Sequence, residues 1–345
     1  MFGRLKLDDI VIFTNQMSSM IAAEVPLPDI LTNLAEETPK PVLQNGIYDI
    51  REQVGRGIDF SDAVAKRTDI FSPIYINMVR AGMSSGMLKT TFIQLSRYLT
   101  QSAETEGKVK SALTYPAIIV GVMIIVVYIM LTRILPMFES MFSTLGGDLP
   151  GITKFVVKLS SFLQDYGLLL LILAGGLAAG FVIFIKTPGG RYWWDGFRIK
   201  IPVVGPLMFK ASISKFIRTL GVMVESNVEI IESLEISGSS TGNVLIEGKI
   251  WEAKERIKKG WDIADSFKTA EIFPNIIIQM ISSGEETGKL DVLLISAADY
   301  YDRIVENTLE SVVAFINPAV TIFMGIVIGG MMLAMFAPII KMGGI

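Results

Sequence analysis

The sequence predicts an all-α membrane protein, in which two homologous cytoplasmic helical bundles of about six helices each are joined to three transmembrane helices. Three observations support this fold class. Three apolar runs are long enough to cross a bilayer, which takes about 20 apolar residues in a helix. The polar segments place apolar residues at helical spacing, without the alternation typical of strands. The first half of the chain recurs in the second half, 202 or 203 residues later.

The composition agrees with a membrane protein that has sizeable water-exposed parts, because 51% of its residues are hydrophobic and only 19% are charged. The net charge of −3 gives no reason to expect a nucleic-acid partner. The sequence contains no cysteine and no histidine, which excludes disulfides, thiolate nucleophiles and the commonest metal ligand. We therefore expect no enzymatic activity, no catalytic residues and no cofactor.

Residues 1–115 are expected to form the first cytoplasmic bundle. Apolar side chains from Ile10 to Ile21 recur at helical spacing, which predicts a helix with one buried stripe. Proline and glycine residues divide the rest of the segment. The remaining helices are expected from Leu27 to a break at Pro39, from about Val42 to Val54, from a cap at Asp59 or Ser61 through Val64, from Phe71 to about Gly82, and from about Met87 towards the membrane.

The three expected transmembrane helices cover residues 116–136, 167–185 and 317–340. Residues 137–166 are expected to form a periplasmic or outside loop, with one amphipathic helix near the membrane surface. Residues 186–316 form the second cytoplasmic bundle in this interpretation.

The orientation in the membrane follows from Lys186, Arg191, Arg198 and Lys200, which come directly after the second span with aromatic residues among them. Cytoplasmic loops carry an excess of lysine and arginine, and aromatic residues gather at membrane interfaces. This pattern predicts that both bundles and the N-terminus lie in the cytoplasm.

The internal duplication is the most specific feature of the sequence. Residues 54–62 align with residues 257–265 at a spacing of 203. Unrelated helices of similar composition would not share the same punctuation by glycine and proline. After a slip of one residue, Met78, Gly82, Gly86, Leu88 and Tyr98 align with Met280, Gly284, Gly288, Leu290 and Tyr300.

Four prolines follow the same register, because Pro116 matches Pro318 and Pro136 matches Pro338. A proline removes one backbone donor and kinks a helix, or begins a new one. We interpret the four positions as joints at the ends of the first and third membrane helices. A functional hinge at Pro116 or Pro318 is the less favoured alternative.

Two pairs of glycines in the apolar runs have the spacing that lets membrane helices approach closely: Gly176 with Gly180, and Gly325 with Gly329. Glycine is also tolerated in a span that has no partner at that position. For a protein that must hold several spans together, we name all four as candidates for helix packing.

Asp299, Asp302, Glu306 and Glu310 recur on one face of a predicted helix. Carboxylates placed in this way can bind a divalent cation with the help of carbonyl or water ligands. A solvated helix face is the commoner explanation, so we assign no metal site.

The segment from Gly284 to Lys289 superficially resembles a phosphate-binding loop. That loop needs four residues between its glycines and a serine or threonine after the lysine, whereas this segment has three residues and Leu290. A junction between two helices explains the glycines better, because glycine reaches the left-handed conformation at little cost.

Taken together, these features resemble the family of type II secretion system protein F and type IV pilus inner-membrane platform proteins, often called the GspF/PilC family. The resemblance covers nearly the whole chain. In the first repeat Met83 stands after Gly82, where the family usually has an acidic residue. The residues that carry the resemblance are Gly284-Glu285-Glu286-Thr287-Gly288-Lys289-Leu290, the two prolines Pro318 and Pro338, the linker Ile201-Pro202-Val203-Val204-Gly205-Pro206-Leu207, and Arg218-Thr219-Leu220 followed by Val228-Glu229-Ile230.

The resemblance implies a multi-pass scaffold in the bacterial inner (cytoplasmic) membrane, which couples a cytoplasmic assembly ATPase to the assembly of pilin-like or pseudopilin subunits. It also implies other inner-membrane assembly proteins as partners, a homo-oligomer and contact with membrane lipid. The motif residues become candidates for partner contact: Gly82, Gly86, Gly284, Glu285, Glu286 and Gly288.

A small membrane transporter or export channel component is the alternative function, because the chain has several spans and an internal repeat. Against it, the middle of each span lacks the ionisable residue that an ion pathway normally needs. A membrane protease is a third interpretation, and the sequence shows no catalytic set at membrane depth that would support it.

Overall fold

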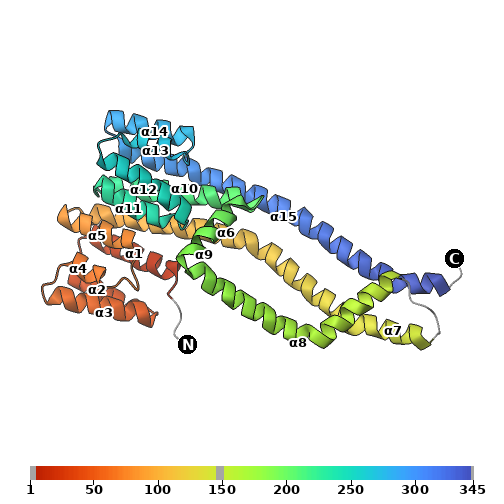
Figure 1. Cartoon of the computed structure of the whole chain (residues 1–345). Helices are drawn as coiled ribbons and strands as arrows, with labels where there is room; N and C mark the ends of the chain where they lie inside the picture. The colour runs from red at the N-terminus through yellow and green to blue at the C-terminus, as the bar shows by residue number, and fades with distance from the viewer. Residues whose placement is uncertain (1–4, 145–150, 343–345) are drawn as a thin grey trace. The chain divides into compact units, whose positions relative to one another are not determined.

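The computed structural model describes residues 5–144 and 151–342, and within these ranges every regular element is a helix. The described chain divides into two compact units. One unit comprises the residues up to Lys108 together with Asp195–Thr308, and the other comprises Val109–Trp194 together with the residues from Leu309 onwards. Figure 1 shows the elements and their labels. The all-α fold class is confirmed.

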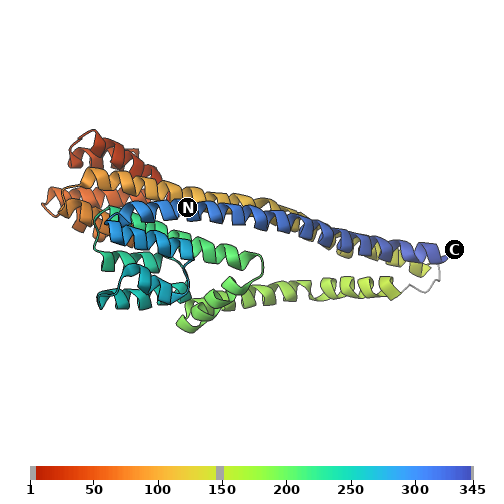
Figure 2. The same ribbon diagram turned by 90° about the horizontal axis from the view of Figure 1, so that it is seen from above.

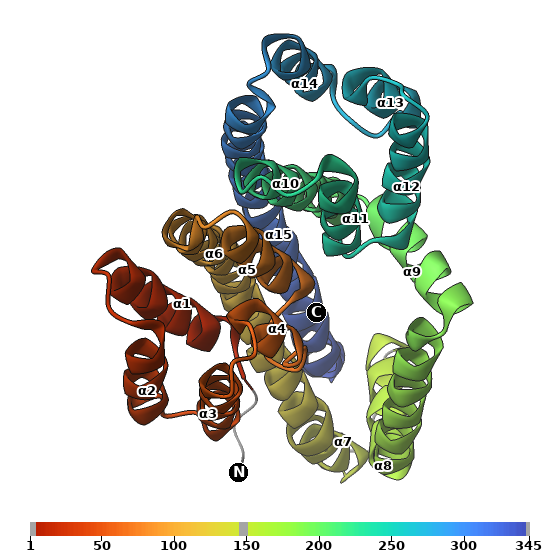
Figure 3. The ribbon, with the colours of Figure 1, turned by 90° about the vertical axis from the view of Figure 1, so that its left-hand side faces the viewer.

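The first unit contains the bundle part of both repeats, and each repeat has six helices in the same order, as the duplication predicts. Figure 3 shows the two sets as two groups, which meet where α5 lies beside α10 and α11. The first set is α1 (Leu7–Ala22), α2 (Leu27–Glu37), α3 (Pro41–Gly55), α4 (Phe60–Ala65), α5 (Pro73–Ser84) and α6 (Leu88–Ile129). The second set is α10 (Val204–Glu225), α11 (Ile230–Ser240), α12 (Val244–Lys258), α13 (Ile263–Ala270), α14 (Asn275–Thr287) and α15 (Leu290–Met342).

Each repeat has its own hydrophobic core, built from the apolar stripes of its helices. In the first repeat Phe71, Tyr75 and Phe92 are fully buried at its centre. In the second repeat Phe216, Phe267 and Phe273 pack ring against ring, with centroids 4.7–5.6 Å apart. The first core also takes in apolar side chains from the second repeat: Val222, Met223, Val228 and Ile236.

Local capping explains where several of these helices begin. The Asp59 carboxylate accepts the Ser61 N–H at 2.8 Å at the start of α4, as the sequence predicts. Asn243 caps α12 in the same way through the N–H groups of Leu245 and Ile246. Such side chains satisfy backbone donors that have no partner inside the helix.

Three helical segments in the described chain are long and apolar enough to cross a membrane: Leu88–Phe138, Thr153–Lys186 and Leu290–Ala337. Their number agrees with the sequence prediction, but two of them also include the sixth helix of a bundle. Helix α6 continues through Pro116, and α15 continues through Pro318 and Pro338. The sixth helix of each repeat therefore continues without a break into an apolar segment.

The region expected as a loop, residues 137–166, is helical wherever the structure describes it. Helix α7 (Leu135–Thr144) precedes residues 145–150, which lie outside the described ranges. Helix α8 (Gly151–Lys186) then includes both the expected amphipathic helix and the second span. The two merge because only Gly167 separates them, and one glycine weakens a helix by only about 1 kcal/mol.

Within the second unit, polar side chains of α8 are satisfied by neighbouring helices. The Thr153 hydroxyl donates to the Ala334 carbonyl of α15 at 2.7 Å, and the Ser160 hydroxyl donates to the Leu131 carbonyl. Both side chains are buried, and a buried hydroxyl without a partner would be costly. By contrast, Leu168, Leu171 and Ile326 are largely exposed, as expected of side chains that face lipid.

Candidate functional site at the contact between the two repeats

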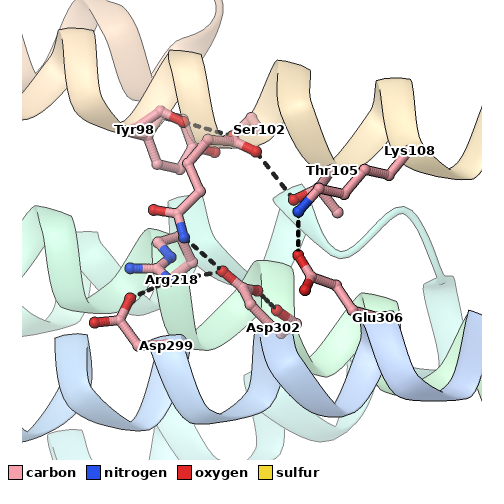
Figure 4. Close-up of polar contacts among 10 residues, drawn as sticks. Tyr98, Ser102, Thr105, Lys108, Arg218, Asp299, Asp302 and Glu306 are labelled. Atoms are coloured by element: carbon pink, nitrogen blue, oxygen red, sulfur yellow. Dashed lines mark hydrogen bonds and ion pairs between the residues drawn. The ribbon is translucent and has the colours of Figure 1, made fainter.

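Helices α6 and α15 run side by side and in the same direction where the repeats meet. The Gln101 amide donates to Asp302 at 3.0 Å, and seven residues further along α6 the Lys108 ammonium pairs with Glu306. Residue numbers rise together along both helices, so the two are parallel. Figure 2 shows them adjacent, and Figure 4 shows the polar contacts between them.

A buried arginine occupies the centre of this contact. The guanidinium of Arg218, on α10, donates from Nη2 to Asp299 at 2.7 Å and to Asp302 at 2.6 Å. The Arg218 side chain is 8% exposed, and that of Asp302 is 17% exposed. Because burying an unpaired charge costs several kcal/mol, the three side chains depend on one another.

Asp302 is the meeting point of the network in Figure 4. It accepts from Arg218 and from the Ser214 hydroxyl, both on α10, and from Gln101 of the first repeat. A carboxylate has two oxygens and about four acceptor positions, so these donors can be accommodated together. Asp302 therefore ties the second repeat internally and also connects it to the first.

A tyrosine of the first repeat adds a buried contact. The Tyr98 hydroxyl lies 3.2 Å from the Thr219 hydroxyl, and burial raises the pKa of the Tyr98 phenol. One turn earlier, Gln94 accepts from the Ser226 hydroxyl at 2.6 Å. These neutral hydrogen bonds lie beside the ionic cluster and align the two repeats.

The acidic face noted in the sequence is thus largely an ion-pair surface. Asp299 and Asp302 are held by Arg218, and Glu306 is held by Lys108. Among the described residues no group of three or more acidic side chains could hold a metal ion. Sequence reasoning missed Arg218 as the partner because it lies 81 residues from Asp299. The available signal was one arginine in the apolar run from Phe216 to Val222.

The glycine motif has the same two structural roles in both repeats. A Cβ added to Gly82 would lie 2.5 Å from the Thr91 hydroxyl, and one added to Gly284 would lie 2.9 Å from the Leu290 Cα. These glycines therefore let the next helix approach closely. Gly86 and Gly288 have φ values of 71° and 67°, the left-handed conformation that ends a helix.

The two glutamates of the motif have different environments. They lie in the last turn of α14, and not in the turn after it as the sequence suggested. Glu285 is half-buried and accepts the N–H groups of Ile263 at 2.7 Å and Ala264 at 3.1 Å, at the start of α13. Glu286 is exposed and accepts only the Ser282 hydroxyl among the hydrogen bonds described. Glu285 is a helix cap, which leaves Glu286 as the accessible carboxylate.

Comparison with known proteins identifies the family to which the two repeats belong. Residues 13–136 and 216–338 each match the family described as "Type II secretion system (T2SS), protein F". The chain belongs to this family. The two matches begin in α1 and α10 and end at Pro136 and Pro338. The family's repeating unit therefore includes a bundle together with an apolar helix.

Several members of the family are similar over almost the whole chain. A type IV pilus assembly protein PilC from Myxococcus xanthus is 34% identical over 99% of this chain and 82% of its own length. A protein of the same name from Thermus thermophilus is 35% identical over 98% of this chain and 83% of its own length. A type II secretion system protein F from Aeromonas hydrophila is 28% identical over 97% of this chain and 86% of its own length.

The four prolines of this family member lie inside helices. Pro136 follows a five-residue π-helical turn, Met130–Ile134, in which the Leu135 N–H reaches the Met130 carbonyl. Proline has no N–H, so one hydrogen bond of a regular α-helix is missing here, and the wider π-helical turn accommodates this gap. Pro116 and Pro318 have no such interruption in the described helices. The role of these positions as joints stays a prediction.

The paired glycines of the spans have open surroundings. A Cβ added to Gly176, Gly180, Gly325 or Gly329 would meet no atom of the described chain within 4 Å, apart from its own helix and chain neighbours. The packing role remains a prediction.

Proposed function

We propose that this member of the type II secretion system protein F family is an inner-membrane platform of a type IV pilus or type II secretion machine. In this role it couples a cytoplasmic assembly ATPase to the assembly of pilin-like or pseudopilin subunits. The relatives named above belong to pilus assembly and type II secretion, and the long apolar helices make the chain a multi-pass membrane protein.

The observation that carries the proposal is the continuity of α6 and α15. Each is one helix that begins in a repeat of the first unit and ends in the second unit. Each helix continues through its internal prolines, so its polar end and its apolar end belong to one helical segment through which movement would be transmitted. This suits a protein that passes movement from a soluble motor to subunits in a membrane.

The proposed scaffold works without chemistry of its own. The polar surfaces of the two repeats would contact the ATPase, and the apolar helices would contact pilin-like subunits, lipid and other inner-membrane assembly proteins. The chain would also assemble with copies of itself. Both repeats and the N-terminus would lie in the cytoplasm, because the basic residues Lys186, Arg191, Arg198 and Lys200 follow the second span.

Co-purification of the ATPase tests the coupling role, and Glu286 gives a specific variant. Glu286→Lys reverses an exposed charge without removing the cap that Glu285 provides to α13. We expect weaker ATPase binding with unchanged membrane insertion. Ser84→Lys is the matched control, because Ser84 is the exposed counterpart of Glu286 in the first repeat. Full ATPase binding by Glu286→Lys would remove this position from the interface.

Failure of the wild-type chain to co-purify with the ATPase of its own system would contradict the coupling role itself. ATP hydrolysis by the purified chain, lost on replacing Lys289, would contradict a scaffold without chemistry.

Reporter fusions test the proposed topology. A fusion after Gly242 should report the cytoplasm, and a fusion after Ser143 should report the outside. The opposite pair of signals would contradict the proposed orientation.

A further inference from the structure

The contact between the two repeats is head-to-tail, because each repeat uses a different surface. The first repeat contributes α5 and α6, including Gln94 and Tyr98. The second repeat contributes the end of α10, α11 and the Ile295 side chain of α15. Since the repeats are homologous, each of them retains the counterpart of the surface that the other one uses.

The second repeat leaves its α5/α6-type surface uncovered. Tyr98 is 5% exposed against Thr219, whereas its counterpart Tyr300 is 40% exposed. Ile74 at the start of α5 is 6% exposed, whereas its counterpart Ile276 at the start of α14 is 43% exposed. Ser296, the counterpart of Gln94, is also exposed. We call Ile276, Ser296 and Tyr300 the outer surface of repeat 2.

The first repeat likewise leaves its α10/α11-type surface uncovered. Ile295 packs against the core of the first repeat, whereas its counterpart Ile93 is 42% exposed. Ala23, the counterpart of Ser226, is exposed, and Met20, the counterpart of Met223, is half-buried. We call Met20, Ala23 and Ile93 the outer surface of repeat 1.

The outer surface of repeat 1 is less apolar than the surface it corresponds to. Ser19 and Asn33, both exposed, take the positions of Val222 and Ile236, which are buried in the contact between the repeats. Within a chain the two repeats are covalently joined, so their contact benefits from a high effective concentration that a contact between two molecules lacks. A more polar surface suits a contact that forms and separates between molecules.

The parallel direction of α6 and α15 makes the contact repeatable in a membrane. The rotation and translation that superpose repeat 1 on repeat 2 carry α6 onto α15, and the two helices point the same way. Applied between two chains, the same operation would leave their membrane helices pointing the same way. A heterologous contact of this kind closes into a ring or continues as an open array.

We propose that a second copy of this chain covers these surfaces. The outer surface of repeat 1 in one copy binds the outer surface of repeat 2 in the next, and reproduces between chains the contact seen within one chain. This names how the copies of the proposed platform meet.

The absence of cysteine from the sequence allows a direct test by cross-linking in membranes. Ala23→Cys and Ser296→Cys correspond to Ser226 and Gln94, whose side chains are 2.6 Å apart within the chain. The two single variants are produced together with different tags and treated with a short bifunctional maleimide. We expect a cross-linked dimer that carries both tags.

The controls separate this arrangement from other modes of association. Glu52→Cys, on the exposed surface of α3, replaces Ala23→Cys in the matched negative control. Gln94→Cys with Ser226→Cys in one chain is the positive control and should cross-link within the monomer. Dimers no more abundant than with Glu52→Cys would overturn the proposal. So would equally efficient cross-linking of Ser296→Cys to itself, which would indicate a symmetric contact.

A variant that disrupts the proposed contact between copies tests this contact separately from the platform role. Tyr300→Glu should abolish the Ala23–Ser296 cross-link while the purified protein keeps its unfolding midpoint, and an undiminished cross-link would contradict the proposed surface. Cross-linking reports only the contact between copies, and co-purification reports only ATPase binding. Failure of one test therefore leaves the other conclusion intact.

Discussion

The first helix of each repeat is tied to the sixth by a polar side chain at the same aligned position, but the chemistry of the tie differs. In the first repeat Asn15 accepts the Ser96 hydroxyl at 2.5 Å, a neutral hydrogen bond. In the second repeat Arg218 is at the position of Asn15 and binds two aspartates of α15. The same helical arrangement therefore accepts either a neutral hydrogen bond or an ion pair at this position. Only the ion pair is also connected to the other repeat, because Asp302 accepts a hydrogen bond from Gln101.

A second difference concerns the short fourth helix of each repeat. Helix α4 is capped by Asp59, which is adjacent in sequence, whereas α13 receives its cap from Glu285 on α14. The first repeat has Met83 at the position of Glu285 and does not need a carboxylate there. The second repeat thus depends more on contacts between distant residues, and the following changes test that difference.

The largest effect is expected from Arg218→Met. It leaves Asp302, which is mostly buried, without its cation, and breaking a buried pair typically costs about 3–5 kcal/mol. The matched change in the first repeat, Asn15→Ala, removes one neutral hydrogen bond and should cost about 1 kcal/mol. Denaturant unfolding of the purified protein measures both. Equal losses would show that the ionic tie is no stronger than the neutral one.

The next effect is expected from alanine at the first motif glycine. Gly284→Ala would press against the backbone of Leu290, and Gly82→Ala would press against the side chain of Thr91. Overpacking of this kind costs about 1–3 kcal/mol. A second change, Thr91→Ala, should partly restore the stability of Gly82→Ala. No comparable rescue exists for Gly284→Ala, and a rescue by Leu290→Ala would contradict this explanation.

Removal of a helix cap should have a smaller effect. Glu285→Ala leaves two N–H groups at the start of α13 without their acceptor, at a cost of about 0.5–2 kcal/mol. Met83→Ala at the aligned position removes no cap, so hydrogen exchange of the α4 amides should not change. If Glu285→Ala leaves exchange at Ile263 and Ala264 unchanged, the cap has no energetic role.

The smallest effect is expected from Lys108→Met. Its ion pair with Glu306 is exposed, and pairs of this type are screened by salt. The hydrogen bond to the Glu306 carboxylate raises the pKa of Lys108 above its ordinary value, so the pair contributes below that ordinary value and its contribution is lost as the pH rises through the folded pKa. The difference in unfolding midpoint between the wild type and Lys108→Met should therefore shrink in high salt and at strongly alkaline pH. A constant difference would assign the effect to packing.

Helix order, internal duplication and the number of apolar runs follow from the sequence, because each depends on spacing along the chain. The period of apolar residues identifies helices, and the aligned glycines of residues 82–86 and 284–288 mark the same helix end in both repeats. Where one helix ends and the next begins was harder to predict. Pro116 and Gly167 are helix-weakening residues by local preference, yet α6 and α8 continue through them.

Only the tertiary structure decided which partner each polar or aromatic residue has. Arg218 and Asp299 are 81 residues apart, and Glu285 is 22 residues from the N–H group it caps, so no local pattern connects them. Tyr98 and Tyr300 are aligned and identical in type, yet one is buried and the other is exposed. Sequence determines what each repeat can bind, whereas exposure depends on which surface the other repeat covers, and that is settled when the two pack together.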